Sequence, residues 1–368
     1  MSLYRRLVRP VLFRTDPEWA HDRSIRFAEL ASRSELTCRA VARRYVVHDE
    51  RLALKLAGLA FRSPLGLAAG YDKNGRAVPL LSAFGFGHVE VGSVSAQRSA
   101  GNPAPRLFRL PRDNAIVVHY GVPNDGAVRV AERLAAVRRT VPVGINLVNT
   151  NRGPAAPVEP DEAVIADYVE SVRLLQDRAD YLCLNLSCPN TNDGSGFFHD
   201  PRRLSTLLEA LDEVGIGKPV FLKVAPFATV GALEAFLEAA ARASFVSGFS
   251  VNLPPGQPPG MRTPAAERAG LPGAVSGTPA EAAANRTIRE LYRRMDRDRY
   301  VIIGSGGVFT AEDAYRKIRL GASLVQLLTS LIYQGPEVVR SIHRRLPQLL
   351  ERDGFAHVRE VIGIDVTV

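Results

Sequence analysis

The 368-residue sequence predicts an α/β fold, a (β/α)8 TIM barrel preceded by a short helical module. From residue 65 onward, eight short apolar runs alternate with helical stretches, which is the pattern of parallel strands joined by crossover helices. A doubly wound dinucleotide fold would carry a G-x-G-x-x-G turn after an early strand, and no such turn is present. A hydrophobic share of 46% and a charged share of 23% exclude a disordered or fibrous chain.

Residues 1–45 are predicted to form a basic amphipathic module, separate from the barrel of residues 46–368. They hold ten arginines and five acidic residues, an excess of +5 out of a net charge of +9. One helix is expected near residues 3–13, and a second follows the N-cap Asp16 and ends near Ser32. The apolar face of this module either packs on the barrel or lies in a membrane interface, with its arginines on anionic headgroups.

Other features of the sequence exclude several classes of protein. No run of about 18 apolar residues is present, and the N-terminus lacks the apolar core of a signal peptide, so we expect a cytoplasmic protein without a membrane span. The basic charge is regional, which argues against a nucleic-acid partner. The three cysteines, Cys38, Cys183 and Cys188, are too few and too irregularly spaced for a disulfide framework or a metal cluster, so no metal site is expected.

The strand candidates follow one another at intervals long enough for a crossover helix. In chain order they are residues 65–70, 88–93, 142–148, 181–187, 220–226, 247–252, 300–306 and 324–330. Most intervals contain a segment with helical periodicity, such as VRVAERLAAVRRT and IADYVESVRLLQDRA. Because catalytic groups in TIM barrels lie at the carboxyl ends of the strands, the residues at these ends are the candidates for chemistry.

The ends of the seventh and eighth strands predict a phosphate site. The seventh ends in Gly304-Ser305-Gly306-Gly307 and the eighth in Leu328-Thr329-Ser330. Small residues let backbone N–H groups approach phosphate oxygens, and the loops after these two strands commonly bind phosphate in TIM barrels. A tight βα turn is the simpler explanation of the glycines, but their place in the barrel favours phosphate.

The remaining strand ends carry amides and cations. Ala68-Ala69-Gly70 would let a flat ring lie against the backbone, and Lys73 and Lys223 are two of only five lysines in the chain. The polar residues at the ends of strands three and four are Asn146, Asn185, Ser187, Cys188 and Asn190. Two cations and several amides, without a carboxylate pair or metal ligands, suit an electron-rich cofactor and a planar polar substrate.

At these residues the chain resembles the dihydroorotate dehydrogenases, in particular their membrane-associated class 2 branch. The matching segments are LGLAAGYDKNG, GFGHVEVGSVSAQRSAGNPAPRLFRL, GIN, LNLSCPNT, LKVAP, IIGSGGV, GASLVQLLTSLIYQGP and the helical N-terminus. They occur in barrel order and cover nearly the whole chain.

The resemblance implies FMN as cofactor and a quinone that reoxidises the flavin through a tunnel under the N-terminal helices, where Arg109 matches the family's arginine. It places Lys223 beside the flavin pyrimidine ring and Lys73 between flavin and substrate. The cofactor residues it implies are Ala69, Gly70, Lys73, Gly92, Asn146, Asn185, Lys223, Ser276, Gly277, Gly306, Gly307, Thr329 and Ser330. The substrate positions it implies are Lys73, Val118, Tyr120, Asn185, Asn190, Thr191 and Asn252, with Cys188 as catalytic base and Lys73 beside it.

The sequence departs from the family at four places. Cys188 stands where the membrane-associated branch has serine, and a thiol of pKa ~8.5 is a sounder base than a hydroxyl. Val118 replaces an asparagine that holds orotate, residues 148–151 replace a G-K-N-K run, and Asn252 matches the family's T-N-T-T run only if one residue is deleted. Otherwise Leu253 takes its place.

The resemblance implies an FMN-dependent oxidoreductase that acts on a C–C bond next to a carbonyl or carboxylate. Its substrate is dihydroorotate or a less polar analogue, and the loss of amides favours a paralogue with the latter. A lyase that uses Lys223 as a Schiff base and an inactive flavin-binding paralogue are the alternatives. The resemblance also implies peripheral contact of residues 1–45 with the inner face of the cell membrane.

Overall fold

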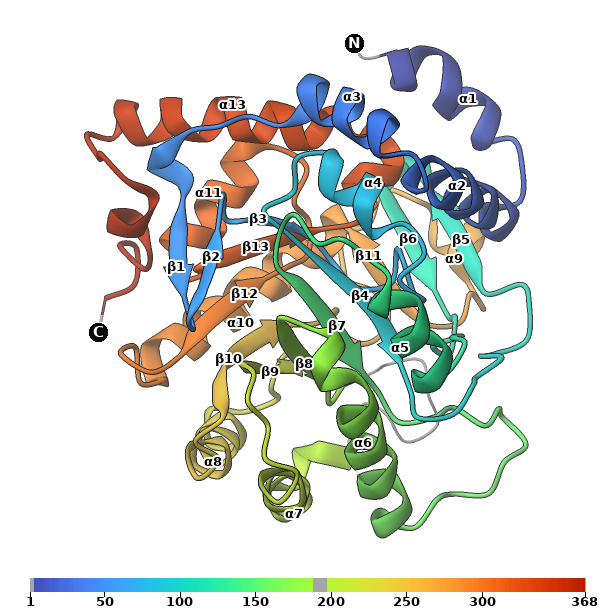
Figure 1. The fold of residues 1–368 in the computed structure, drawn as a ribbon, viewed down its shortest axis with the longest axis vertical. Helices are drawn as coiled ribbons and strands as arrows, with labels where there is room; N and C mark the ends of the chain where they lie inside the picture. Colours follow the sequence, from blue (N-terminus) through green and yellow to red (C-terminus); the bar gives the residue numbers. More distant parts are fainter. Residues whose placement is uncertain (1–2, 188–196, 368) are drawn as a thin grey trace.

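A closed barrel of parallel strands forms the centre of the computed structural model, which describes residues 3–187 and 197–367 (Figure 1). The strands pair in the order β3-β4-β7-β8-β9-β10-β12-β13, and β13 pairs with β3 to close the barrel. Their bounds are β3 (Leu65–Leu67), β4 (His88–Val94), β7 (Val143–Leu147), β8 (Tyr181–Asn185), β9 (Val220–Val224), β10 (Val246–Val251), β12 (Val301–Gly304) and β13 (Leu324–Leu327). The predicted TIM barrel, with its eight strands in chain order, is therefore confirmed.

Several strands are shorter than the apolar runs that predicted them. Strand β3 ends at Leu67 rather than at Gly70, and β12 ends at Gly304 rather than at Gly306. The small and polar residues that follow leave the strand ladder and form the loops at the carboxyl face of the barrel. These loops therefore lie at the face where TIM barrels bind substrates and carry catalytic residues.

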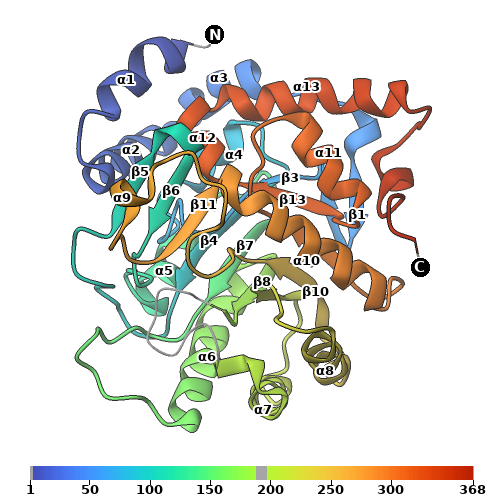
Figure 2. The ribbon, with the colours of Figure 1, turned by 180° about the vertical axis from the view of Figure 1, so that it is seen from behind.

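Helices on the outside of the barrel cover its apolar faces, and all but the last two connect its strands (Figures 1 and 2). They are α4 (Val78–Ala83), α5 (Ala127–Ala135), α6 (Asp161–Leu175), α7 (Pro201–Asp212), α8 (Val230–Ala241), α10 (Glu281–Arg294), α11 (Ala311–Arg319), α12 (Thr329–Gln334) and α13 (Glu337–Arg352). Helices α5 and α6 lie on the two segments whose periodicity predicted them. The core residues of the strands are fully buried, as expected for a parallel sheet covered on both sides.

Two small sheets outside the barrel were not predicted. A hairpin of β1 (Leu54–Leu56) and β2 (Leu59–Phe61) precedes β3, and Ala57 and Gly58 turn it with positive φ values of 48° and 75°. A three-stranded antiparallel sheet is formed by β5 (Leu107–Leu110), β6 (Ala115–Val118) and β11 (Ala274–Gly277). Strand β11 follows the short helix α9 (Ala265–Arg268), so this sheet joins two segments about 160 residues apart in the sequence. It brings Val118 and Ser276 to the same side of the barrel.

Residues 1–45 contain three helical segments, and not the two that the sequence predicted. A π-helical turn (Tyr4–Val8) continues into α1 (Arg9–Leu12), and α2 (Pro17–Ser32) is followed by α3 (Glu35–Tyr45). The N-cap at Asp16 is confirmed, since its carboxylate accepts a hydrogen bond of 2.8 Å from the Trp19 N–H. Helix α3 was not predicted, and within the described chain none of its residues is buried.

The N-terminal segment packs on the barrel and also exposes apolar side chains. The Tyr4 hydroxyl donates to the Ile332 carbonyl at 2.7 Å, and the Phe13 ring contacts the Tyr333 ring with 5.1 Å between centroids. In Figures 1 and 2, α2 lies beside β5 and β6. Large apolar side chains that remain exposed in this segment are Leu3, Leu7, Val8, Val11, Trp19, Phe27, Leu30 and Leu36. Among the described residues, no helix is both long and apolar enough to cross a membrane.

Candidate flavin and substrate site

A cavity of about 580 Å³ opens between the carboxyl ends of the barrel strands and helix α2. It is lined by residues that lie far apart in the sequence but end at the same face of the barrel. Those that the sequence predicted for the site are Ala69, Gly70, Val118, Tyr120, Ser276, Gly277, Gly306, Gly307, Thr329 and Ser330. The other predicted residues that the structure describes do not line this cavity; they are Lys73, Gly92, Asn146, Asn185, Lys223 and Asn252.

One end of the cavity has small and hydroxyl-bearing residues that suit a phosphate group. The Thr329 and Ser276 hydroxyls lie 3.1 Å apart, and the Ser330 hydroxyl is buried without a hydrogen-bond partner among the described residues. A buried hydroxyl without a partner is costly, so a ligand oxygen would satisfy it. Gly306 and Gly307 have φ values of +85° and +75°, a conformation that favours glycine and turns the backbone around this end.

Small residues, Ala68, Ala69 and Gly70, follow the first barrel strand and form a flat wall of the site. The Gly70 N–H donates to the Gly92 carbonyl at 2.7 Å, which joins the loop after β3 to β4. Gly70 has a φ of +106°, and a Cβ atom there would lie 3.4 Å from the Leu328 side chain. Together with Ala69, this backbone offers a surface against which a planar ring can stack.

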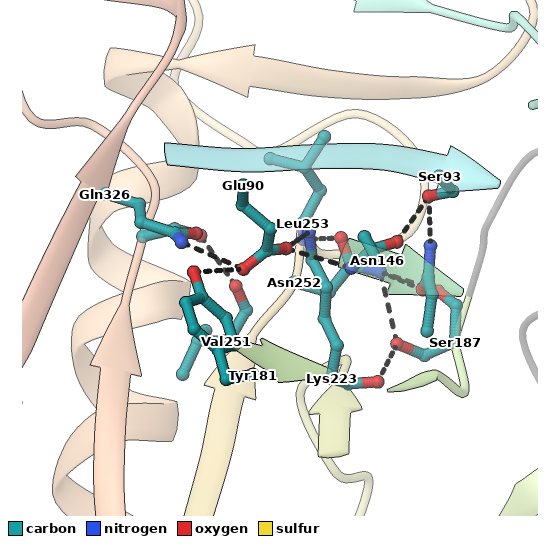
Figure 3. A network of polar contacts seen from close by, with 12 residues as sticks. Glu90, Ser93, Asn146, Tyr181, Ser187, Lys223, Val251, Asn252, Leu253 and Gln326 are labelled. Atoms are coloured by element: carbon teal, nitrogen blue, oxygen red, sulfur yellow. Dashed lines mark hydrogen bonds and ion pairs between the residues drawn. The ribbon is translucent and has the colours of Figure 1, made fainter. Parts of the chain in front are cut away.

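A buried polar network joins side chains from several barrel strands (Figure 3). The Asn146 amide donates to the Glu90 carboxylate at 2.9 Å, and the Lys223 ammonium lies 4.0 Å from the same oxygen. The Gln326 amide and the Tyr181 hydroxyl donate to the other oxygen at 2.9 and 3.3 Å. The predicted residues Asn146 and Lys223 are therefore brought together by a carboxylate that the sequence analysis did not single out.

The network continues toward the predicted substrate side. Ser93 donates to the Asn146 side-chain oxygen and accepts from the Asn185 amide at 3.2 Å. The Asn252 amide donates to the Asn185 side-chain oxygen at 3.2 Å and to the Ser187 carbonyl at 3.0 Å. Asn252 therefore lies beside Asn185. The neighbouring Leu253 lines the cavity instead.

Lys73 approaches the site from the loop after β3 and meets helix α2. Its Nζ lies 2.9 Å from the His21 Nε2 and 4.2 Å from the centre of the Tyr120 ring. Burial lowers the pKa of Lys73 to about 8. Burial, followed by the charge of Lys73, lowers the pKa of His21 well below its usual value, so the lysine donates this hydrogen bond and the imidazole accepts it. Asp72 fixes the loop by accepting the Ala77 N–H at 2.7 Å.

Comparisons with known proteins agree with this geometry. The family model for dihydroorotate dehydrogenase matches residues 51–350. The chain belongs to the dihydroorotate dehydrogenase family. It is 40% identical over 364 residues to the dihydroorotate dehydrogenase (quinone) of Roseiflexus castenholzii, covering 98% of this chain and 96% of that protein. The same-named protein of Natronomonas pharaonis is 39% identical over 366 residues and both chains are fully covered.

The fold comparison gives the same family. The crystal structure of a dihydroorotate dehydrogenase from Eimeria tenella in complex with ferulenol superposes with a TM-score of 0.82 at 30% identity, covering 95% of this chain and 96% of that chain. The ligand-free structure from the same organism gives a TM-score of 0.81. As a member of this family, the protein is an FMN-dependent oxidoreductase that acts on a CH–CH group. The lyase and the inactive-binder alternatives are not favoured.

The described residues fit FMN. The unpartnered Ser330 hydroxyl and its neighbours suit the phosphate, the small residues around Gly70 suit the ring, and the amide and ammonium groups of Asn146 and Lys223 suit its polar edge. The site also extends outward, where Arg109 donates to the Thr15 carbonyl at 2.7 Å and lies 4.8 Å from the Phe13 ring centre. The cavity is lined largely by apolar side chains there.

Some predicted residues are not placed by the structure. Cys188, Asn190 and Thr191 lie outside the described residues, so their assigned roles stay predictions. The loop of residues 148–151 is described and lies near the loop that follows Val118, since Asn151 donates to the Gly121 carbonyl at 2.9 Å.

Two functional candidates were missed by sequence reasoning. Glu90 is an acid within the apolar strand run HVEVGS, and that isolated acid was a usable signal for a buried charge. His21 gave no such signal, because its partner Lys73 lies 52 residues further along the chain.

Proposed function

We propose that this protein oxidises dihydroorotate to orotate on FMN and passes the electrons to a quinone. The observation that carries the proposal is the single cavity that joins the phosphate end, the flat wall at Gly70 and an apolar outer part under helix α2. The relatives named dihydroorotate dehydrogenase (quinone) support both the substrate and the acceptor.

The phosphate end and the polar network would hold the cofactor. Ser276, Thr329 and Ser330 would bind the phosphate, and Lys223 and Asn146 would bind the pyrimidine end of the flavin. When bound, FMN supplies the two-electron acceptor that the oxidation of a C–C bond requires.

The substrate would lie on the side of Lys73, Asn185 and Asn252. The ammonium of Lys73 would pair with a substrate carboxylate or carbonyl, and the two amides would orient the ring. Cys188, by its place in the LNLSCPNT segment, is proposed to take the proton from the carbon next to the one that loses hydride.

Residues 1–45 are proposed to contact the inner face of the cell membrane from the cytoplasm. Apolar side chains such as Leu3, Leu7 and Val11 are exposed by 71%, 61% and 63%, and the segment carries ten arginines. This combination favours an interface between acyl chains and anionic headgroups. A quinone dissolved in the membrane would then reach the apolar outer part of the cavity directly.

A steady-state assay tests this function. The purified full-length protein is expected to be yellow, to release FMN on denaturation, and to reduce a short-chain quinone only when dihydroorotate is present. A dinucleotide released in place of FMN, or quinone reduction that does not depend on dihydroorotate, would contradict the proposal.

One observation favours a second candidate substrate. Val118 and Leu253 line the cavity with apolar groups, where the resemblance expects an asparagine at position 118. A substrate that lacks a polar group at this point would lose no binding free energy. A polar substrate whose group finds no hydrogen-bond partner there would bind more weakly by about 1–3 kcal/mol. In the same assay, a less polar cyclic analogue of dihydroorotate that reacts faster would support this candidate.

A further inference from the structure

The carboxylate of Glu90 is fully buried inside the barrel, yet it lies within reach of the flavin-site residues. One oxygen faces the Asn146 amide at 2.9 Å and the Lys223 ammonium at 4.0 Å. The other faces the Gln326 amide at 2.9 Å and the Tyr181 hydroxyl at 3.3 Å. Figure 3 shows the carboxylate between these two pairs of partners.

All four partners can donate, which suits an ionised carboxylate. Asn146 and Gln326 present amide nitrogens, Tyr181 presents a hydroxyl, and Lys223 presents an ammonium on a side chain that is only 10% exposed. A buried charge is tolerated when it is paired and hydrogen-bonded. Lys223 pairs with Glu90 at 4.0 Å, and Asn146, Gln326 and Tyr181 supply the hydrogen bonds to the carboxylate.

The carboxylate also acts on the neighbouring titratable groups. Burial first, and the charge of Glu90 second, raise the pKa of the Tyr181 hydroxyl well above its usual value. The same two causes, in the same order, raise the pKa of the Cys183 thiol. Both groups are therefore held in the neutral form beside the carboxylate.

We propose that Glu90 is a positioning residue that fixes Lys223 and Asn146 beneath the flavin and offsets part of the positive charge that the flavin experiences from Lys223. The inference rests on the proposed placement of Lys223 at the pyrimidine end, and it holds for any substrate. A carboxylate at 4.0 Å from the ammonium would make this end of the flavin less electron-attracting than a lone lysine would.

Sulfite affinity of the FMN-loaded protein tests the proposal. Sulfite forms an anionic adduct with bound flavins, and positive charge near the pyrimidine end strengthens it, so its dissociation constant reports the local charge without any catalysis. Lys223→Met is expected to weaken sulfite binding by about a hundredfold, because Glu90 then faces the flavin unpaired. Adding Glu90→Gln to this variant is expected to raise its affinity for sulfite again by at least about tenfold.

The double variant is the decisive one, because it removes both buried charges and avoids leaving either charge unpaired in the barrel. The two-electron midpoint potential of the flavin in the double variant should also rise above that in Lys223→Met. The expected rise is about 30 mV for each tenfold gain in sulfite affinity. Lys317→Met is the matched control for loss of a buried lysine, since Lys317 bonds to Asn285 on the outer helices and should leave sulfite binding unchanged.

Two results would overturn the inference, and they are distinguishable. If the double variant binds sulfite no better than Lys223→Met, Glu90 does not offset the charge of the lysine. If Lys223→Met itself binds sulfite as the unmodified protein does, the proposed placement of Lys223 fails and the inference fails with it. The Tyr181→Phe variant, which removes one donor to Glu90 but no charge, should change the affinity by less than about threefold.

Discussion

The Lys73 ammonium donates a 2.9 Å hydrogen bond to the His21 imidazole, and this contact joins the N-terminal segment to the loop after the first barrel strand. His21 lies on α2 and lines the same cavity as Tyr120, whose ring is 4.2 Å from the lysine. Helix α2 therefore directly contacts a residue proposed to bind substrate.

The first prediction concerns His21→Leu, which removes the acceptor of this hydrogen bond. Hydrogen bonds to charged groups contribute about 1.5–3 kcal/mol, so the buried ammonium should lose its proton more easily. The pKa of Lys73, lowered by burial to about 8, should fall further, by about one unit. The pH at which the rate of flavin reduction declines on the alkaline side should move down with it.

Stopped-flow measurements of flavin reduction across pH check this prediction. Ser24→Ala is the matched control, because Ser24 also lies on α2 but its hydroxyl is 3.5 Å from Tyr71 rather than close to Lys73. An unchanged alkaline limit in His21→Leu would show that the histidine does not support the charge of Lys73.

The second prediction is that Lys73→Met stabilises the FMN-free protein near neutral pH. Burial lowers the pKa of Lys73 from 10.5 to about 8, so the unfolded chain binds this proton more tightly than the folded one. The free-energy cost of burying the charged Lys73 side chain is present in full below pH 8, and it is relieved as the pH rises from about 8 to 10.5. The free energy of unfolding of the variant should exceed that of the unmodified protein by about 1–3 kcal/mol at pH 7.

Denaturant unfolding at pH 7 and at pH 10 measures the difference between the two proteins. The gain from Lys73→Met should shrink at the higher pH. A gain that is the same at both values would mean that the ammonium carries no cost of burial.

The third prediction is that Val118→Asn strengthens orotate binding. Val118 lines the cavity at the end of β6, and an amide there would provide the hydrogen bond that the resemblance assigns to this position. One added hydrogen bond of about 1 kcal/mol or more should tighten binding by about fivefold to tenfold. Perturbation of the flavin absorbance on titration with orotate gives the dissociation constant.

Val118→Ala serves as the size control for that experiment, since it removes the isopropyl group without adding a polar one. If Ala and Asn change orotate affinity equally, the effect comes from space and not from hydrogen bonding.

The fourth prediction concerns the exposed apolar face of residues 1–45. Leu7 and Val11 are 61% and 63% exposed, so the double variant Leu7→Glu/Val11→Glu should fold normally. Two charges on the face proposed to enter the membrane interface should weaken binding to anionic liposomes by at least about tenfold. Co-sedimentation with vesicles measures this loss.

Val128→Glu/Val158→Glu is the corresponding control, because these valines are exposed by 53% and 78% outside the N-terminal segment. Equal binding by the two double variants would argue against a membrane contact through residues 1–45.

Sequence patterns were sufficient for the barrel, because the alternation of apolar runs and helices is a local property. The residues at the strand ends followed from the fold, and four of them, Gly306, Gly307, Thr329 and Ser330, line one cavity. The small sheet of β5, β6 and β11 was missed, because it pairs Val118 with Ala274 across a long stretch of sequence.

Contacts between side chains from distant segments were also not predicted from the sequence. His21 and Lys73, like Glu90 and Lys223, meet only once the barrel has closed, and no spacing rule links them. The positions of Asn252 and Leu253 could not be assigned from the sequence either, because one inserted residue reverses which of them faces the cavity. The structure placed Asn252 in the polar network and Leu253 on the cavity wall.

Anaerobic mixing of the FMN-loaded protein with dihydroorotate tests the central claim most directly. The account predicts that the yellow absorbance of the flavin bleaches in a single turnover and returns when a quinone is added. A flavin that stays oxidised with dihydroorotate, while chemical reductants still bleach it, would contradict the proposed reaction.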